Sequence, residues 1–258
     1  TKVAEPERYI DKFLYDISAT DESKIDWEAY DRTTSALQHL HHHELVYVRS
    51  KLRFLYSNGD DDTLMELIKS ASEFDASQGT YDLMRLLNTN FDSPTIYWAL
   101  GILFKELWQL ETAAMWLEQV LLFADLSDPL RAKTLLELSD CYIWGNRQLT
   151  KAIEYAKVAM DLGKRSATVD GYKILAHAFL KTGKIREAKV YLEQADSDRD
   201  VEVKYLRGLV LYRNGSRKEA NQEWKPLLTH RTENLRFHNI KQEILKYYFE
   251  GEPYLKVN

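Results

Sequence analysis

Four of the seven histidines fall in one short run, His39-Leu40-His41-His42-His43. On a helix, His39 and His43 share a face because they are four residues apart, and imidazole nitrogens are common zinc ligands. No cysteine or carboxylate pattern supplies further ligands beside them. We interpret the run as a solvated or structural cluster, with adventitious metal binding as the alternative, and we predict no metal site.

Cys141 is the single cysteine and the next candidate for chemistry, as a nucleophile. It lies beside Tyr142 within a predicted helix, and a free cysteine in such a place is usually a small buried hydrophobic residue. One cysteine excludes a disulfide within the chain and a metal cage of several cysteines. It favours a reducing compartment, which predicts a protein of the cytoplasm or the nucleus.

Other catalytic patterns are missing from the sequence. It has no glycine-rich phosphate loop, no Gly-x-Ser-x-Gly and no His-Glu-x-x-His. Asp60-Asp61-Asp62 lacks the glycine and distal glutamate of a calcium loop, and acidic residues are favoured at the start of a helix. We therefore expect no catalytic residues, no cofactor and no enzymatic activity.

Composition narrows the class of protein further. The 258 residues carry a formal charge of −5, so they lack the general basic excess of a nucleic-acid binder. Ten glycines and five prolines are too few for the many turns of an all-β protein. No apolar run approaches the roughly 18 residues of a transmembrane helix. Helical periodicity runs through most of the chain.

The helices must position any functional residue, and their sequence repeats. Gly183 and Gly215 are 32 residues apart, and so are Ala188 and Ala220. A period of about 20–50 residues is typical of a solenoid built from stacked units. Within each unit we expect a small residue in the first helix and an alanine in the second, where the two helices approach closely. The small residues are Gly101, Ser139, Ala176 and Gly208, and the alanines are Ala113, Ala152, Ala188 and Ala220.

This pattern resembles the tetratricopeptide repeat, a helix-turn-helix unit of about 34 residues. The resemblance implies an all-α protein, an α-α superhelix. Residues 93–230 make four such units, and the Ala152 unit carries an extra residue after Gly145. Residues 1–92 form an N-terminal helical segment with one degenerate unit at about 45–75, where Leu64 takes the place of the alanine. Residues 231–258 supply a capping helix and a tail, because exposed repeat ends need a cap.

In this family the first helices line a concave groove that receives a peptide or helix. The resemblance places in the groove the side chains three residues before and one residue after each small residue, together with side chains further along the same helices. Asp140 is among them, and the expected partner-binding residues are Arg49, Arg53, Trp98, Ile102, Leu136, Trp144, Lys173, His177, Lys181, Tyr205, Leu209, Tyr212 and Arg213. Trp, Tyr and Arg are frequent anchors of interfaces. The rival interpretation is that several of these side chains, Trp98 and Trp144 among them, are buried by neighbouring helices.

The resemblance predicts a non-enzymatic scaffold or adaptor subunit that binds a protein partner. A chaperone-like or targeting receptor that binds peptides transiently is the alternative, and a metal protein rests only on the histidine run. Lys173 and Arg213 make an acidic segment one candidate for the partner. The two-carboxylate clamp known in the family is absent, because His177, Trp98 and Ile102 occupy its other places. The oligomeric state stays open.

Overall fold

This computed structural model describes residues 32, 34, 35, 37–56, 61–87, 93–163, 165–195, 200–229 and 234–250. Every regular element in these residues is an α-helix, as the sequence predicts. The chain divides into two compact units, Thr1–Arg85 and Leu86–Asn258. Residues 1–31 of the expected N-terminal segment and the tail after residue 250 lie outside the described part.

The first unit contains α3 (His43–Tyr56), α4 (Asp61–Phe74) and α5 (Ala76–Leu87), and α3 packs against α4. Leu64, the residue in the place of the repeat alanine, is buried with 2% exposure. Helix α5 begins directly after Asp75, which caps it. Oδ1 of Asp75 accepts hydrogen bonds from the backbone N–H groups of Ser77 and Gln78, at 2.8 and 3.2 Å.

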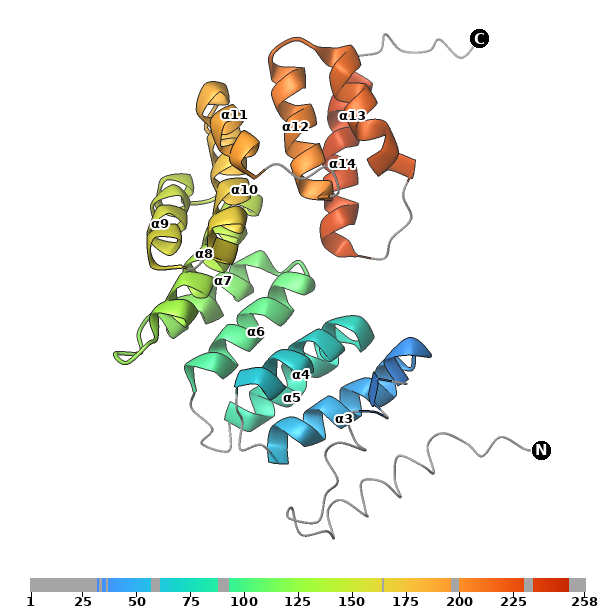
Figure 1. Cartoon of the computed structure of the whole chain (residues 1–258), viewed down its shortest axis with the longest axis vertical. Coiled ribbons are helices and arrows are strands. Elements are labelled where there is room, and N and C mark those ends of the chain that lie inside the picture. Colours follow the sequence, from blue (N-terminus) through green and yellow to red (C-terminus); the bar gives the residue numbers. More distant parts are fainter. Residues whose placement is uncertain are drawn as a thin grey trace, which may run out of the picture. The chain divides into compact units, whose positions relative to one another are not determined.

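The second unit is a series of helix pairs followed by one helix (Figure 1). The pairs are α6 (Pro94–Glu106) with α7 (Leu110–Val120), α8 (Asp128–Trp144) with α9 (Leu149–Leu162), α10 (Arg165–Lys181) with α11 (Ile185–Gln194), and α12 (Val201–Arg213) with α13 (Arg217–Thr229). The first helices α6, α8, α10 and α12 contact one another in succession. The last helix, α14 (Leu235–Glu250), packs against α12 and α13.

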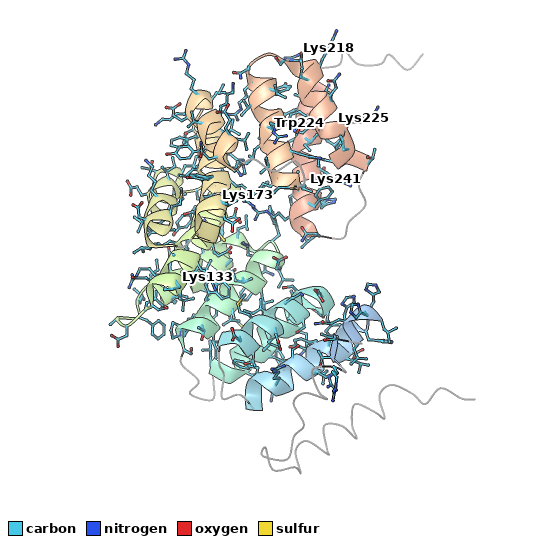
Figure 2. All side chains as sticks on the ribbon, in the orientation of Figure 1. Lys133, Lys173, Lys218, Trp224, Lys225 and Lys241 are labelled. Atoms are coloured by element: carbon cyan, nitrogen blue, oxygen red, sulfur yellow. The ribbon has the colours of Figure 1, made fainter. Side chains whose placement is uncertain are left out.

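Close approach at small side chains holds each pair together. The second-helix alanines Ala113, Ala152, Ala188 and Ala220 are all 0% exposed. A methyl group at Gly208 would overlap the ring of Trp224, which donates a hydrogen bond from Nε1 to the Tyr205 carbonyl at 3.1 Å. Figure 2 labels Trp224 among the side chains of the last helices. A methyl group at Gly101 would overlap Leu117 in the same way. The repeat spacing of small residues is therefore a packing requirement.

The turn between the two helices of each pair needs a left-handed residue seven positions after the small one. Gly183 (φ 77°) and Gly215 (φ 86°) occupy it in the last two pairs. In the α8–α9 turn it is Asn146 (φ 53°), whereas Gly145 has an ordinary φ of −72°. In the α6–α7 turn it is Trp108, with φ 58°. A left-handed conformation is unfavourable for a bulky residue, so neighbouring contacts must hold Trp108 in it.

Replacing Ala188 by Trp should lower the free energy of unfolding by roughly 1–3 kcal/mol, because the fully buried site has no room for an indole. The control is Lys189→Trp, the next residue on α11, whose side chain is 63% exposed. Urea denaturation measures both variants. Equal midpoints for the two would contradict close helix packing at this alanine.

Candidate functional site

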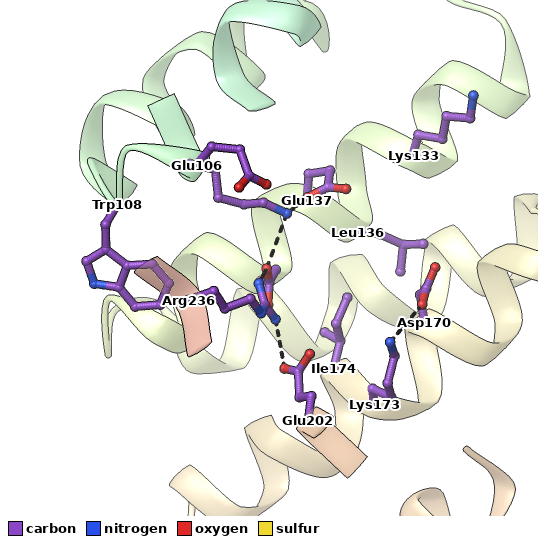
Figure 3. Close-up of a pocket in the computed structure, with 12 residues that line it drawn as sticks. Glu106, Trp108, Lys133, Leu136, Glu137, Asp170, Lys173, Ile174, Glu202 and Arg236 are labelled. Atoms are coloured by element: carbon purple, nitrogen blue, oxygen red, sulfur yellow. Dashed lines mark hydrogen bonds and ion pairs between the residues drawn. The ribbon is translucent and has the colours of Figure 1, made fainter. Parts of the chain in front are cut away.

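A pocket of about 420 Å³ opens in the second unit along the first helices of the pairs (Figure 3). Four first helices, the α6–α7 turn and α14 contribute its walls. The lining residues are Lys105, Glu106, Trp108, Lys133, Leu136, Glu137, Asp140, Asp170, Lys173, Ile174, Glu202 and Arg236. Nine of these twelve carry charged side chains, so the pocket suits a polar ligand more than a purely apolar one.

Arg236, in the first turn of α14, joins three elements of the pocket. Its Nη1 and Nη2 donate to both carboxylate oxygens of Asp140 on α8, at 2.5 and 2.9 Å. Its Nη2 also donates to Oε1 of Glu202 on α12, at 2.7 Å (Figure 3). Such a two-pronged arginine–carboxylate pair is strong and directional. Burial alone would raise the pKa of Asp140, but Arg236 and then Lys105 hold it well below its usual range.

Lysines on α6 and α10 neutralise the other carboxylates of the wall. Lys105 pairs with Glu137 and lies 3.4 Å from Oδ2 of Asp140. Lys173 lies 3.1 Å from Asp170 (Figure 3) and 3.0 Å from Asp200, which does not line the pocket. Burial would lower the pKa of Lys173, but the nearby carboxylates, with Glu202 first, raise it. Both lysines are therefore charged and already engaged within the chain.

An aromatic cluster lies behind Arg236. The guanidinium carbon of Arg236 is 5.3 Å from the centre of the Trp144 ring, and Trp108 meets the same ring edge-on at 5.4 Å. His177 and Tyr205 pack on Trp144 at 4.7 and 6.0 Å. Arg236 and Trp108 both line the pocket, whereas Trp144, which both of them contact, does not. Trp108 makes this contact from a left-handed backbone conformation.

Two nitrogens of this cluster, Nε1 of Trp144 and Nε2 of His177, find no hydrogen-bond partner among the described residues. The same is true of Nε1 of Trp98. Burial, followed by the positive charge of Lys181, lowers the pKa of His177 to about 3. His177 is therefore neutral at ordinary pH.

Only some of the predicted partner-binding residues reach the pocket. Leu136 and Lys173 line it, and Ile102 is half-buried on α6 without lining it. Trp98, His177, Tyr205 and Leu209 are not the exposed anchors that the sequence predicts, since their exposure is 7%, 1%, 1% and 3%. They pack between neighbouring helices, as the rival interpretation of the sequence expected for Trp98. Trp144 is half-buried in the aromatic cluster.

The remaining predicted residues make contacts within the chain. Tyr212 packs on Tyr247 of α14 at 5.1 Å, and Arg213 donates to the Leu180 carbonyl. Lys181 is half-buried, and its burial lowers its pKa. In the first unit, Arg49 donates from Nε to Oγ1 of Thr34 at 2.8 Å. Arg53 lies 3.8 Å from Glu66 and lines a separate pocket of that unit.

Sequence reasoning missed most of the charged wall. Three of the missed residues each lie one helical turn before a predicted residue, on the same face of its helix: Lys133, Asp170 and Glu202. This spacing could have revealed them. No sequence signal links Arg236 to Asp140, because 96 positions separate them. Trp108 stands where two other units have glycine, and this repeat position could have marked it as a left-handed residue.

The first candidates for chemistry gain no support as sites. Among the described residues, no three His, Cys, Asp or Glu side chains gather as a metal site. His43 pairs instead with Glu73, 3.5 Å away. Cys141 is buried, and this burial raises the pKa of its thiol. In the same described part of the chain, no helix has the length and apolar character needed to cross a membrane.

Known structures share this arrangement of helix pairs. The structure of pilF from Pseudomonas aeruginosa covers 84% of this chain and 96% of its own, with a TM-score of 0.53 at 15% identity. The match to a tetratricopeptide repeat protein from Parabacteroides merdae covers 85% of this chain and 98% of that protein's chain, with a TM-score of 0.51 at 12% identity. The chain has the tetratricopeptide-repeat fold. No protein-family model and no curated protein matches the sequence.

The low pKa of His177 predicts a pH-dependent stability. Because the unfolded histidine has a pKa of 6.5 and the folded one about 3, the unfolded state binds more protons between these values. The contribution of His177 to stability is then fully present above the pKa of the unfolded histidine. It falls as the pH decreases below about 6.5. Between about pH 7 and pH 5.5, this residue should lower the unfolding free energy by about 1 kcal/mol. Urea denaturation at both pH values should show this decrease in unfolding free energy for the wild type and not for His177→Gln. The other histidines are the same in both proteins, so the difference reports His177 alone.

Trp108→Gly should cost less stability than the loss of a fully buried tryptophan, although it too removes a large side chain. Relief of the left-handed strain, about 1–2 kcal/mol, offsets part of the lost burial and of the lost ring contact, which is about 0.5–1.5 kcal/mol. The comparison variant is Trp224→Ala at a site with 0% exposure, which should cost about 3–5 kcal/mol. Thermal or urea unfolding compares them. A loss as large for Trp108→Gly as for Trp224→Ala would refute the strain at this turn.

Proposed function

We propose that the protein is a non-enzymatic scaffold or adaptor subunit that holds a segment of a protein partner in the pocket of the second unit. The tetratricopeptide-repeat fold supports protein–protein interaction in general. The pocket itself carries the specific proposal, because it brings charged side chains from four first helices to one place. A peptide or helix presents both polar groups and apolar surface, and this wall offers complements to both.

The strained Trp108 supports a binding role for this pocket. Left-handed bulky residues concentrate at functional sites, where surrounding contacts maintain them. Trp108 lines the pocket and contacts Trp144, so its side chain serves the pocket at a cost to the turn. In the α10–α11 and α12–α13 turns, glycine occupies the same position without that cost.

A transient receptor for many peptides is the second candidate function, and it uses the same pocket. A stable scaffold retains one partner in a fixed ratio, whereas a receptor of this kind retains many segments weakly. The cytoplasmic or nuclear location stays a prediction that rests on the single cysteine.

Charge reversal at the pocket rim tests the function. The variant Lys133→Glu with Asp170→Arg reverses two exposed rim residues and keeps the net charge. The control Lys157→Glu with Glu154→Arg makes the same exchange at exposed positions of the second helix α9. Immobilised protein retains partners from an extract of its source cells, and quantitative mass spectrometry compares the variants. We expect partner retention to fall at least about tenfold for the rim variant alone, because misplaced charges at an interface weaken association.

Circular dichroism provides the check that both variants are folded. Full retention by the folded rim variant would place partner binding outside this pocket. One partner in a constant ratio supports the scaffold, and many substoichiometric peptides support the receptor.

A further inference from the structure

The carboxylates of Asp140 and Glu202 and the face of Trp144 surround one guanidinium group. We call this site the guanidinium seat. Arg236 of the same chain occupies it. We propose that the seat receives an arginine side chain of a partner protein, and that Arg236 is its internal competitor. This inference rests on the proposed function, because it names the chemistry by which the pocket recognises its partner.

The seat has the components that recognise arginine specifically. Asp140 is 8% exposed and accepts two parallel hydrogen bonds, a geometry that matches the planar fork of a guanidinium. Glu202, 14% exposed, takes a third N–H from the same group. The Trp144 ring lies 5.3 Å from the guanidinium carbon, within the range of a cation–π contact. An ammonium group cannot form the same fork.

The charge of the wall favours a basic occupant. Without Arg236, the pocket is lined by five carboxylates, those of Glu106, Glu137, Asp140, Asp170 and Glu202. Only three lysines, Lys105, Lys133 and Lys173, oppose them, so the wall has a net charge of −2. Lys173 is also engaged by Asp200 outside the pocket. This excess of negative charge would repel an acidic segment. An arginine would instead supply the positive charge that Arg236 now provides.

The position of Arg236 makes exchange possible. It lies in the first turn of α14, at the start of the helix. The apolar anchors of α14 follow Arg236 along the helix, at Phe237, Ile240 and Ile244, with 7%, 2% and 0% exposure. Tyr247 stacks on Trp224 of α13 in the same region. The arginine side chain can therefore leave the seat while these contacts keep α14 on the last repeat.

Internal occupation also leaves part of the site unsatisfied. Nε1 of Trp144 and Nε2 of His177, both beside the seat, have no hydrogen-bond partner among the described residues. A buried polar group without a partner destabilises the arrangement that contains it. Arg236 can donate to acceptors but offers nothing to the Trp144 N–H. A peptide brings backbone carbonyls along with its arginine.

The experiment uses blocked pentapeptides as probes, acetyl-Gly-Gly-X-Gly-Gly-amide, with X as arginine, citrulline, lysine or glutamate. Citrulline matches arginine in size but carries no charge. Isothermal titration measures binding to the full-length wild type, to Arg236→Ala, and to Arg236→Ala combined with Asp140→Asn. Arg236→Gln retains a long polar side chain and replaces Arg236→Ala if that variant does not fold, as judged by circular dichroism.

The arginine peptide should bind Arg236→Ala at least about tenfold more tightly than it binds the wild type, because the competitor is gone. Its affinity for Arg236→Ala should also exceed that of the citrulline and lysine peptides by at least about tenfold. Adding Asp140→Asn should remove this preference. Equal binding of arginine and citrulline peptides to Arg236→Ala would overturn the guanidinium seat. Equal arginine binding to wild type and Arg236→Ala would overturn the competition. Preferential binding of the glutamate peptide would overturn the basic chemistry of the partner.

These outcomes are separable from the proposed function. If the rim charge reversal abolishes partner retention but no probe prefers arginine, the pocket binds a partner by another chemistry, and only the guanidinium seat fails. If the arginine peptide binds as expected while partner retention survives the rim reversal, the seat exists but the scaffold function lies elsewhere.

Discussion

Close contact between the two helices of each pair is the constraint on which the rest of the second unit depends. At Gly208 the Trp224 ring occupies the space of a side chain, and at Gly101 the Leu117 side chain does so. These contacts set each first helix firmly against its second helix. Stacking then aligns the first helices, so that side chains at equivalent positions of successive repeats form one surface. The pocket is a consequence of this alignment, since its wall repeats the same helix positions in α8, α10 and α12.

The last helix changes what that surface offers. A repeat array ends in an exposed apolar face, and α14 covers it with Ile240, Ile244 and Tyr247. The same helix also carries Arg236 into the pocket, where it meets Asp140 and Glu202. One element thus completes the hydrophobic core of the unit and neutralises part of its acidic wall. Stability and recognition are coupled in this helix, because both depend on where α14 docks.

Buried polar groups give the pocket its character. Asp140 is shared between Arg236 and Lys105, so three elements far apart in sequence meet at one carboxylate. Removing either cation would leave the charge of a carboxylate that is only 8% exposed poorly compensated, which is costly. The aromatic cluster behind Arg236 helps to bury His177, and burial is the first cause of its lowered pKa. A site of this kind favours one geometry of its occupant over others, because both the charges and the rings are fixed by packing.

The sequence alone determined the fold class and the repeat, because the small residues that allow close helix packing recur at a regular spacing along the chain. Ala188 and Ala220 predict their buried positions for this reason. Local spacing also placed Leu136, Asp140 and Lys173 on the faces that line the pocket. It could not decide which side chains stay open, since Tyr205 and His177 follow the same spacing and are buried by Trp144 and their neighbours. The partnership of Arg236 with Asp140 was likewise decided only by the tertiary structure. An ion pair across 96 residues arises from the docking of whole helices, and no local pattern of residue types encodes it.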